Sequence, residues 1–334
     1  MNLTSFVARR LLLLIPTLFG VLLITFLISH VVPGDAAQLI AGPRATPEII
    51  QRIREEYGLD KPLHIQFFMY ISQVLRGDLG KSIRTRRPVG ADIRAFFPAT
   101  FELTTTAMLL AVLFGIPLGV ISAVYRDRWP DHLSRVFSVI GVSMPIFWLG
   151  LLLLFLFYIR LGILPGPGRI SGDPPAHLTG LYLLDSLLTG NWRALGDAAL
   201  HLVLPAFTLA FAVLARITRM TRSSMLEALG QDYVRTARAK GLMERWVVTR
   251  HALRNALIPT LTVIGLSYGE LLGGAVATEL IYAWPGMTHY VVGSMTSLDF
   301  PAVMGVTLVI AVIYITVNLL VDLTYALVDP RIRY

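Results

Sequence analysis

Residues 136–159 read VFSVIGVSMPIFWLGLLLLFLFYI, a run of 24 residues without a charged side chain. An α-helix rises about 1.5 Å per residue, so roughly 20 apolar residues cross the hydrocarbon core of a bilayer. This run therefore predicts a membrane-spanning helix. Five further stretches meet the same requirement, at residues 11–31, 100–124, 198–217, 256–277 and 302–327. We expect an all-α polytopic membrane protein with six transmembrane helices.

The composition agrees with a membrane protein. Of the 334 residues, 55% are hydrophobic and 15% are charged, whereas a soluble domain carries about 25% charged residues. High hydrophobicity with low charge excludes a disordered chain and argues against an ordinary soluble enzyme. The chain has no cysteine, which excludes disulfides, thiolate nucleophiles and cysteine-ligated metals.

Lys and Arg are distributed unevenly between the segments that join the spans. Cytoplasmic loops near span ends collect these residues. With the N-terminus inside, the inside segments hold sixteen Lys and Arg and the short outside segments hold three. The other ten lie within residues 32–98, and so long a segment crosses largely regardless of its charge. We therefore expect both termini in the cytoplasm.

The spans divide the chain into an N-terminal transmembrane helix (1–31), an external helical cap subdomain (32–98), a five-helix transmembrane domain (99–328) and a cytoplasmic tail (329–334). Within the cap, Thr46 is a candidate helix cap, Pro47 suits the first helical position, and Gly58 can stop the helix. The stretch PLHIQFFMYISQVLRG predicts a second, more apolar helix. Residues 162–197 contain LTGLYLLDSLLTG, which is too short to span and predicts an interfacial or re-entrant element.

No arrangement of residues predicts catalysis, a metal site or nucleotide binding in this chain. Gly80-Lys81-Ser82 resembles the end of a phosphate-binding loop, but that motif needs a glycine at position 75, where Leu75 stands. The seven histidines are scattered, and His201 alone predicts a packed or hydrogen-bonded helix residue. A membrane-embedded enzyme is therefore a weak alternative, and a secondary transporter lacks a visible inverted repeat.

The most informative loop is the basic segment between the fourth and fifth spans, RITRMTRSSMLEALGQDYVRTARAKGLMERWVVTRHALRN (216–255). Asp232 suits a helix N-cap, and Gly241 can adopt the left-handed conformation that ends a helix. Leu226, Leu229, Tyr233 and Ala237 recur at spacings of three and four, which predicts one apolar stripe. The stripe favours docking into a protein groove. The alternative is a basic loop that binds lipid head groups.

This segment resembles the coupling loop of type I ABC importer permeases, and its details resemble the dipeptide/oligopeptide/nickel permease family. The matching stretches include MTRSSMLE (220–227), DYVRTARAKG (232–241) and HALRNALIP (251–259). Elsewhere they include ARRLLLLIPTLFGV, RGDLGKS, SMPIFWLG, AWPGM and VNLLVDLTYALVDPRIRY. The Arg-Arg start close to the first span is similar to the first of the family's two permease types. One departure is that Arg235, Thr236 and Ala237 stand where the general loop has Glu-Ala-Ala.

The resemblance implies the type I importer fold, a bacterial inner membrane location and transport by alternating access. It implies a heterodimer with a second permease subunit, two ATPase subunits that bind ATP and Mg, and a periplasmic solute-binding protein. No cofactor is implied in this chain. Peptides are the implied substrates, and nickel chelates, glutathione and haem remain alternatives within the same family.

The resemblance also implies which residues couple the permease to the ATPases, within a coupling loop at 218–255. They are Asp232, Tyr233, Arg235, Thr236, Ala237, Arg238, Ala239, Lys240, Gly241 and His251.

Glu270 is a carboxylate near the middle of the fifth span. Such a group is costly in hydrocarbon, so it should face the bundle interior or a water-filled cavity. Ser267, Gly273, Gly274 and Ala277 are spaced to share its helix face, which would suit a translocation path. The alternative is a protonated Glu270, or one paired with the partner subunit.

The stretch ELIYAWPGM (279–287) follows the fifth span on the outside. Its aromatic residues predict an anchor at the membrane interface. The resemblance instead implies an external gate at Tyr282, Trp284 and Pro285.

Overall fold

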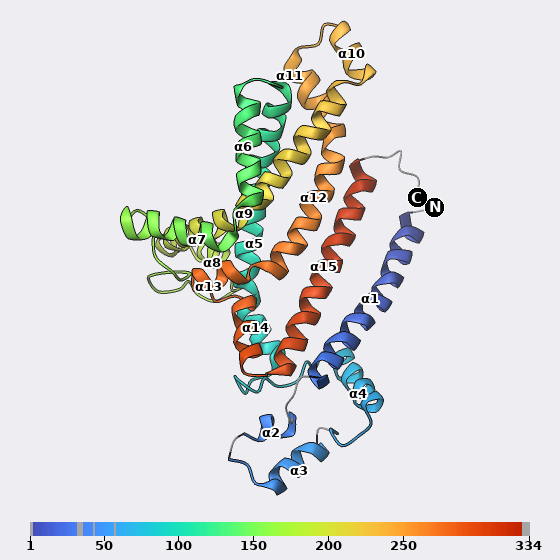
Figure 1. Ribbon diagram of the computed structural model, residues 1–334, viewed down its shortest axis with the longest axis vertical. Coiled ribbons are helices and arrows are strands. Elements are labelled where there is room, and N and C mark those ends of the chain that lie inside the picture. The colour runs from blue at the N-terminus through green and yellow to red at the C-terminus, as the bar shows by residue number, and fades with distance from the viewer. Residues whose placement is uncertain (1–2, 32–35, 43, 57, 329–334) are drawn as a thin grey trace. The chain divides into compact units, whose positions relative to one another are not determined.

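The structure is a computed structural model that describes residues 3–31, 36–42, 44–56 and 58–328. Apart from an isolated bridge between Lys81 and Pro88, the regular elements in these residues are helices (Figure 1). They are α1 (Leu3–Val31), α2 (Ala36–Ala41), α3 (Pro47–Glu56), α4 (Leu63–Leu75), α5 (Val89–Val124), α6 (Trp129–Ser143), α7 (Ile146–Leu153), the π-helix η1 (Leu154–Arg160), α8 (Tyr182–Leu188), α9 (Trp192–Leu229), α10 (Asp232–Ala239), α11 (Glu244–Trp246), the π-helix η2 (Val247–Ala252), α12 (Leu253–Gly274), α13 (Val276–Ile281), α14 (Met287–Thr296) and α15 (Phe300–Val328).

The predicted all-α membrane fold is confirmed. Five helices of the described residues are long and apolar enough to cross a membrane, and a bent helix pair raises the number to six. The long helices α1, α5, α9 and α15 contain the predicted first, second, fourth and sixth spans. The cytoplasmic tail predicted at 329–334 lies outside the described residues.

The third predicted span is not one straight helix. The chain breaks between Ser143 and Ile146, and the segments on either side are bent by 105°. The cause is Pro145, whose ring disfavours a helical conformation at the preceding residue. Met144 accordingly has φ −80° and ψ 124°, in the extended region. The apolar composition therefore predicted a membrane segment here, but it did not predict the bend between its two helices.

The fourth span is longer than predicted, because α9 runs without a break from Trp192 through Pro205 to Leu229. Proline removes one backbone donor from a helix, but packing on both sides can still hold the helix together. Here His201 is buried and hydrogen-bonded to Ser171, and the predicted loop at 218–255 begins with three turns of α9.

The fifth predicted span is shorter than expected and ends before residue 277. Helix α12 stops at Gly274, and Ala277 belongs to the separate short helix α13.

The described chain forms two compact units. The first comprises the residues up to Phe97 together with Met287–Ile315, and the second comprises Pro98–Gly286 together with the residues from Thr316 onward. The boundary between the two units at Phe97 and Pro98 lies at the predicted end of the cap segment. The predicted transmembrane domain at 99–328, by contrast, is divided, because 287–315 pack with the N-terminal unit.

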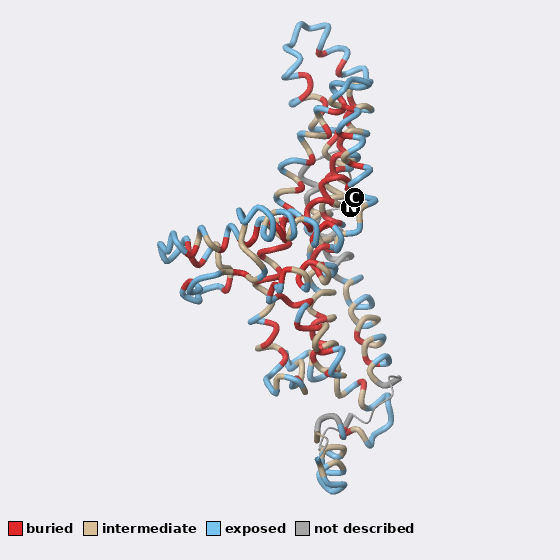
Figure 2. The backbone as a smooth tube through the Cα atoms, turned by 60° about the vertical axis from the view of Figure 1, so that its left-hand side comes forward, coloured by how far each residue is buried: buried red, intermediate tan, exposed pale blue. Residues whose placement is uncertain are grey.

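Helix α9 is the centre of the second unit. Its buried residues include Leu202, Leu209 and Ile217, which join residues of α5 and α12 in one apolar core. Burial follows α9 along much of its length, whereas the α7–η1 segment is largely exposed (Figure 2). Helices α10 and α11 lie at one end of these long helices, and α7, α8 and α13 lie toward the other (Figure 1).

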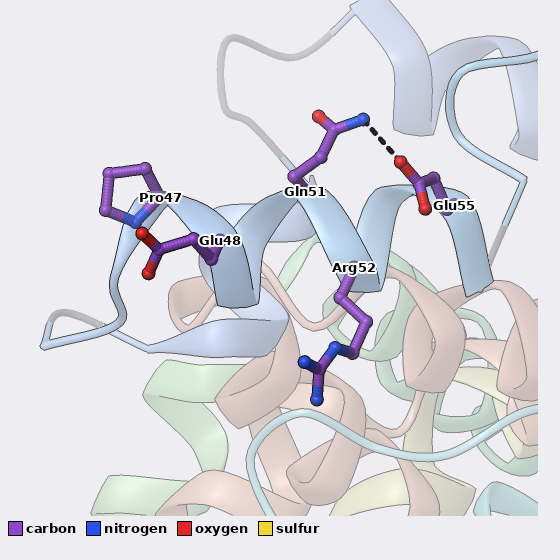
Figure 3. A pocket seen from close by; sticks show the side chains of 5 residues that line it. All are labelled: Pro47, Glu48, Gln51, Arg52 and Glu55. Atoms are coloured by element: carbon purple, nitrogen blue, oxygen red, sulfur yellow. Dashed lines mark hydrogen bonds between the residues drawn. The ribbon is translucent and has the colours of Figure 1, made fainter.

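The first unit contains the predicted cap helices. Phe26 of α1 packs on Phe67 of α4, with ring centroids 5.2 Å apart. Helix α3 begins at Pro47 and carries an open pocket lined by its own exposed side chains, among them Glu48, Arg52 and a Gln51–Glu55 hydrogen bond of 2.9 Å (Figure 3). All the lining comes from one helix, so this pocket does not enclose a ligand.

Candidate functional site

The helix–turn–helix predicted between the fourth and fifth spans is present as α10, a turn and α11. Gly241 has φ +74°, which confirms the predicted left-handed glycine. Asp232 is the first residue of α10 and not its cap. The cap position is Gln231, without a side-chain cap hydrogen bond. Asp232 instead forms a weak exposed pair with Arg235, 3.2 Å apart.

The predicted apolar stripe was wrong in one respect. The chain turns at Gly230 and Gln231 between α9 and α10, so helical spacing does not continue across it. Val234 and Ala237 are therefore the buried positions of α10, and Tyr233 is exposed. The two buried side chains pack against Met225 and other apolar residues of the same chain, so they are not free to enter a partner's groove.

The apolar side chains that remain exposed lie around the turn. Leu242, Met243 and Trp246 are 42%, 55% and 44% exposed. Beside them Arg238 of α10 donates two hydrogen bonds to Glu244 of α11, at 2.6 and 3.1 Å, and this contact raises the pKa of Arg238. We call the exposed face of Tyr233, Leu242, Met243 and Trp246 the turn surface.

The other residues predicted for coupling lie beside the turn surface. Arg235, Thr236, Ala239, Lys240 and Gly241 are exposed, whereas His251 is half-buried on η2. The predicted coupling residues thus lie in one region together with the exposed Leu242, Met243 and Trp246, which were not among them. Their signal was three large apolar residues within five positions of a glycine stop.

A buried ion pair ties this region to the rest of the second unit. Asp131 of α6 is fully buried and accepts hydrogen bonds from Arg222 of α9, at 2.6 and 2.8 Å. The same carboxylate accepts from the Ser122 hydroxyl of α5 and from the Asp127 backbone N–H. Arg222 lies two turns before α9 ends, so the helix that leads into α10 is held to α5 and α6.

Glu270 is half-exposed on α12 and forms an ion pair with Arg216 of α9, with 2.6 Å between Oε2 and Nη1. The sequence analysis placed Arg216 both at the end of the predicted span 198–217 and at the start of the basic loop, and it did not pair this arginine with Glu270. The partner of Glu270 within this chain was therefore missed.

The predicted face around Glu270 is only partly present. Gly273 and Gly274 are exposed like Glu270, but Ser267 is 2% exposed and packs inside the second unit. Ala277 lies beyond the end of α12, on α13. The helical spacing that grouped these residues ends at Ala275, where the helix breaks.

The aromatic residues of the 279–287 segment are buried, which contradicts their predicted role as membrane-interface anchors. Tyr282 is 2% exposed and its hydroxyl lies 2.9 Å from that of Thr208. Trp284 is 1% exposed and donates its indole N–H to the Ala99 carbonyl at 2.9 Å. Pro285 is exposed. Buried hydrogen-bond partners favour the interior over the lipid interface.

Glu279 connects the segment 279–287 to α5 through a buried hydrogen bond. Its carboxylate is buried and accepts a hydrogen bond from Thr100 of α5 at 2.6 Å. A Cβ atom on Gly286 would lie 2.2 Å from the Glu279 carboxylate, so any larger residue here would force the buried Glu279 side chain to move. The turn at 282–286 therefore closes tightly over a buried charge.

A second buried pair holds the Gly- and Pro-rich segment in place. Arg169 donates to Glu102 of α5 at 2.6 Å, and both side chains are 7% exposed. The guanidinium also lies 3.7 Å from the ring centre of Tyr182. An acid inside an apolar span was the available signal, because such a charge needs a partner.

Asp185 of α8 anchors the end of this segment. Its carboxylate accepts hydrogen bonds from the backbone N–H groups of Thr179 and Gly180, both at 2.9 Å. Burial raises the pKa of Asp185, but the hydrogen bonds from Thr179 and Gly180 outweigh it, so the pKa lies below its ordinary value.

Among the described residues, no group of three or more His, Cys, Asp or Glu side chains could hold a metal ion. Each buried carboxylate described above accepts hydrogen bonds from partners within the same chain.

Comparison with known proteins decides the family. Residues 115–334 match the model of the binding-protein-dependent transport system inner membrane component, and residues 3–104 match that of the N-terminal part of such membrane components. The chain belongs to this transport family. It is a membrane-embedded permease component of a binding-protein-dependent transport system, as the resemblance predicted.

Curated relatives cover nearly the whole permease. A probable D,D-dipeptide transport system permease protein of Escherichia coli (strain K12) is 56% identical over 94% of this chain and 93% of its own length. A dipeptide transport system permease protein of Alkalihalophilus pseudofirmus is 44% identical over 99% of both chains. A glutathione transport system permease protein of Salmonella typhimurium is also 44% identical over 99% of both chains.

Proposed function

We propose that this permease imports dipeptides or short oligopeptides by alternating access, in a complex driven by ATP. The observation that supports a peptide substrate is the similarity of this chain, over nearly its entire length, to permeases named for dipeptide transport. The complex contains a second permease subunit, two ATPase subunits and a periplasmic solute-binding protein. ATP and Mg bind to the ATPase subunits, and this chain is a non-catalytic subunit with both termini in the cytoplasm.

Coupling to an ATPase occurs at the turn surface and the predicted coupling residues beside it. Exposed aromatic and methionine side chains are the kind that fill a partner's pocket, and a few such residues usually dominate an interface. Arg238 and Glu244 form a partly exposed ion pair that bridges α10 and α11 across Gly241. This replaces docking through the whole predicted stripe, because Ala237 is buried and Leu226 and Leu229 pack against the same core.

Trp246→Ala tests this coupling surface. Loss of an interface aromatic typically weakens binding by about 2 kcal/mol or more. We expect the ATPase subunits to co-purify less well with the variant. Trp192→Ala is the matched control, since Trp192 is 69% exposed at the start of α9 and outside the coupling region. Equal recovery of ATPase subunits with both variants would argue that the surface faces lipid instead.

The external gate lies at Tyr282, Trp284 and Pro285. The buried contacts of Tyr282 and Trp284 connect this turn to α9 and α5, so a movement of those helices would displace the turn. The translocation path runs past Glu270, Gly273 and Gly274, whose exposure in an apolar helix is compatible with a water-filled route.

Glutathione is the second candidate substrate, because a permease of similar identity and coverage is named for it. Glutathione is itself a tripeptide, so both candidates present a free ammonium group and a free carboxylate to the path, and glutathione adds a second carboxylate.

Uptake into proteoliposomes tests the proposal. The purified complex is reconstituted with its binding protein and supplied with ATP and tritium-labelled alanyl-alanine. We expect labelled peptide to accumulate with ATP and not with a non-hydrolysable ATP analogue. Excess unlabelled alanyl-alanine should compete better than excess glutathione. Competition by glutathione alone would favour the second candidate, and uptake without ATP would favour a secondary transporter.

A further inference from the structure

The ion pair between Arg216 and Glu270 joins two apolar helices where charge is unexpected. Arg216 of α9 and Glu270 of α12 meet at 2.6 Å, with 34% and 55% of their side chains exposed. Both helices qualify as candidate membrane spans. A charged side chain facing hydrocarbon costs several kcal/mol, so this open side of the two helices must meet water or protein and not lipid.

An exposed face continues along both helices from this pair. On α9, Arg216, Arg219 and Ser223 follow at spacings of three and four and are exposed or half-exposed. On α12, Leu266, Glu270 and Gly273 are exposed at the same spacings. Residues so spaced share one helix face. The glycine leaves room beside the carboxylate, and Leu266 adds an apolar contact one turn away.

The pair does not use all its hydrogen-bonding groups. Arg216 donates to Glu270 through Nη1, and its Nη2 forms no hydrogen bond with a described residue. Arg219, one turn along α9, forms no ion pair with any described residue. The two arginines therefore offer guanidinium donors to an anionic group, and Glu270 offers its carboxylate to a cationic group. Both lie on one face, so a small molecule that carries both charges would fit.

We propose that Arg216, Arg219 and Glu270 form a substrate subsite on the translocation path, which binds the free carboxylate and free amino group of a small zwitterionic peptide. The arginines receive the carboxylate, because a guanidinium presents paired donors that fit it. Glu270 receives the ammonium group. The substrate thus exchanges with an ion pair that already exists, so neither charge is left without a counterion. This subsite rests on the proposed peptide function.

Site-specific cross-linking tests contact with the substrate. A photoreactive benzoyl-phenylalanine is placed at Leu266 in the full complex, which is then illuminated during ATP-driven uptake of tritiated alanyl-alanine. We expect label on the Leu266 variant. The same residue at Leu200 is the control, because Leu200 is exposed on the opposite side of α9 from Arg216 and should not be labelled.

Charge variants test the role of the pair. Arg216→Gln and Glu270→Gln should each lower the labelling at Leu266 and the uptake rate about tenfold, the loss expected for one charge-assisted hydrogen bond. Arg193→Gln, an exposed arginine in the first turn of α9, should change neither. The exchanged variant, Arg216→Glu with Glu270→Arg, restores an ion pair but reverses its direction, so uptake should stay low while the complex assembles.

The outcomes separate the subsite from the wider proposal. Full uptake by the exchanged variant would show that the pair only joins helices. Loss of the second permease subunit on purification of Arg216→Gln would show that the face binds that subunit. Peptide uptake by the complex with benzoyl-phenylalanine at position 266, without labelling of that residue, would also overturn the subsite and leave peptide transport standing. An unaltered complex that hydrolyses ATP but takes up no peptide would overturn both.

Discussion

Replacing Asp131 by asparagine removes the negative charge that holds Arg222 of α9. The carboxylate is fully buried, and Arg222 is 21% exposed. The change leaves a largely buried guanidinium without its counterion and turns one acceptor into a donor that faces Arg222 or Ser122. Breaking a buried ion pair costs about 3–5 kcal/mol. Because Arg222 keeps some contact with solvent, we expect a loss near the lower limit, about 3 kcal/mol.

The assay is thermal unfolding of the purified permease in detergent at one fixed heating rate. At roughly 2–4 °C per kcal/mol, the apparent midpoint should fall by about 6–12 °C. Asp127→Asn is the matched control, since it is the same substitution four residues away, on a side chain 69% exposed. Its midpoint should stay unchanged.

A double variant separates loss of the pair from loss of packing. In Asp131→Leu with Arg222→Met, apolar groups of similar size replace both charges, so no buried charge remains uncompensated. Such replacements are often neutral or stabilising. We expect the double variant to recover most of the lost stability. If Asp131→Asn melted like Asp127→Asn, the pair would not hold α9 and our reasoning would be refuted.

Three further outcomes are expected. Gly241→Val should strain the left-handed turn by roughly 1–2 kcal/mol and abolish substrate-stimulated ATP hydrolysis in the reconstituted complex. Gly190→Val places equal strain at φ +67° in another open turn and should leave that stimulation intact. Asp185 has a lowered pKa, so its stabilising effect is present above the ordinary value of 3.8 and is lost as the pH falls toward the lowered value. The melting difference between Asp185→Asn and the unaltered chain should therefore shrink in acid, whereas Asp173→Asn, an exposed change, should show no difference at any pH. Reporter fusions should read external after Asp173 and internal after Arg238, and an internal reading after Asp173 would overturn the proposed orientation.

The candidate site was predictable from the sequence in part. The left-handed Gly241 followed from local chemistry, since glycine adopts positive φ at helix ends without a steric penalty. The set of exposed residues around Gly241 could not be predicted from local chemistry. Helical spacing assigned Tyr233 to the apolar face, but the turn at Gly230 changed the register and buried Val234 instead. A break of two residues was enough to move the face.

The sequence by itself determined the class of the protein, because the length and apolarity of a span are local properties that the bilayer thickness imposes. It also determined the family, through ordered stretches along the whole chain. The ion pairs depended on three-dimensional packing, since Asp131 and Arg222, or Arg216 and Glu270, lie many residues apart and nothing local selects their partners. The bend at Pro145 is the clearest contrast. Prolines at positions 16, 117, 205 and 259 lie inside continuous helices, whereas at Pro145 the chain breaks. Each of these proline rings removes one backbone donor from its helix. Whether the helix continues therefore depends on whether the surrounding helices can satisfy the backbone carbonyl groups that lose their donor.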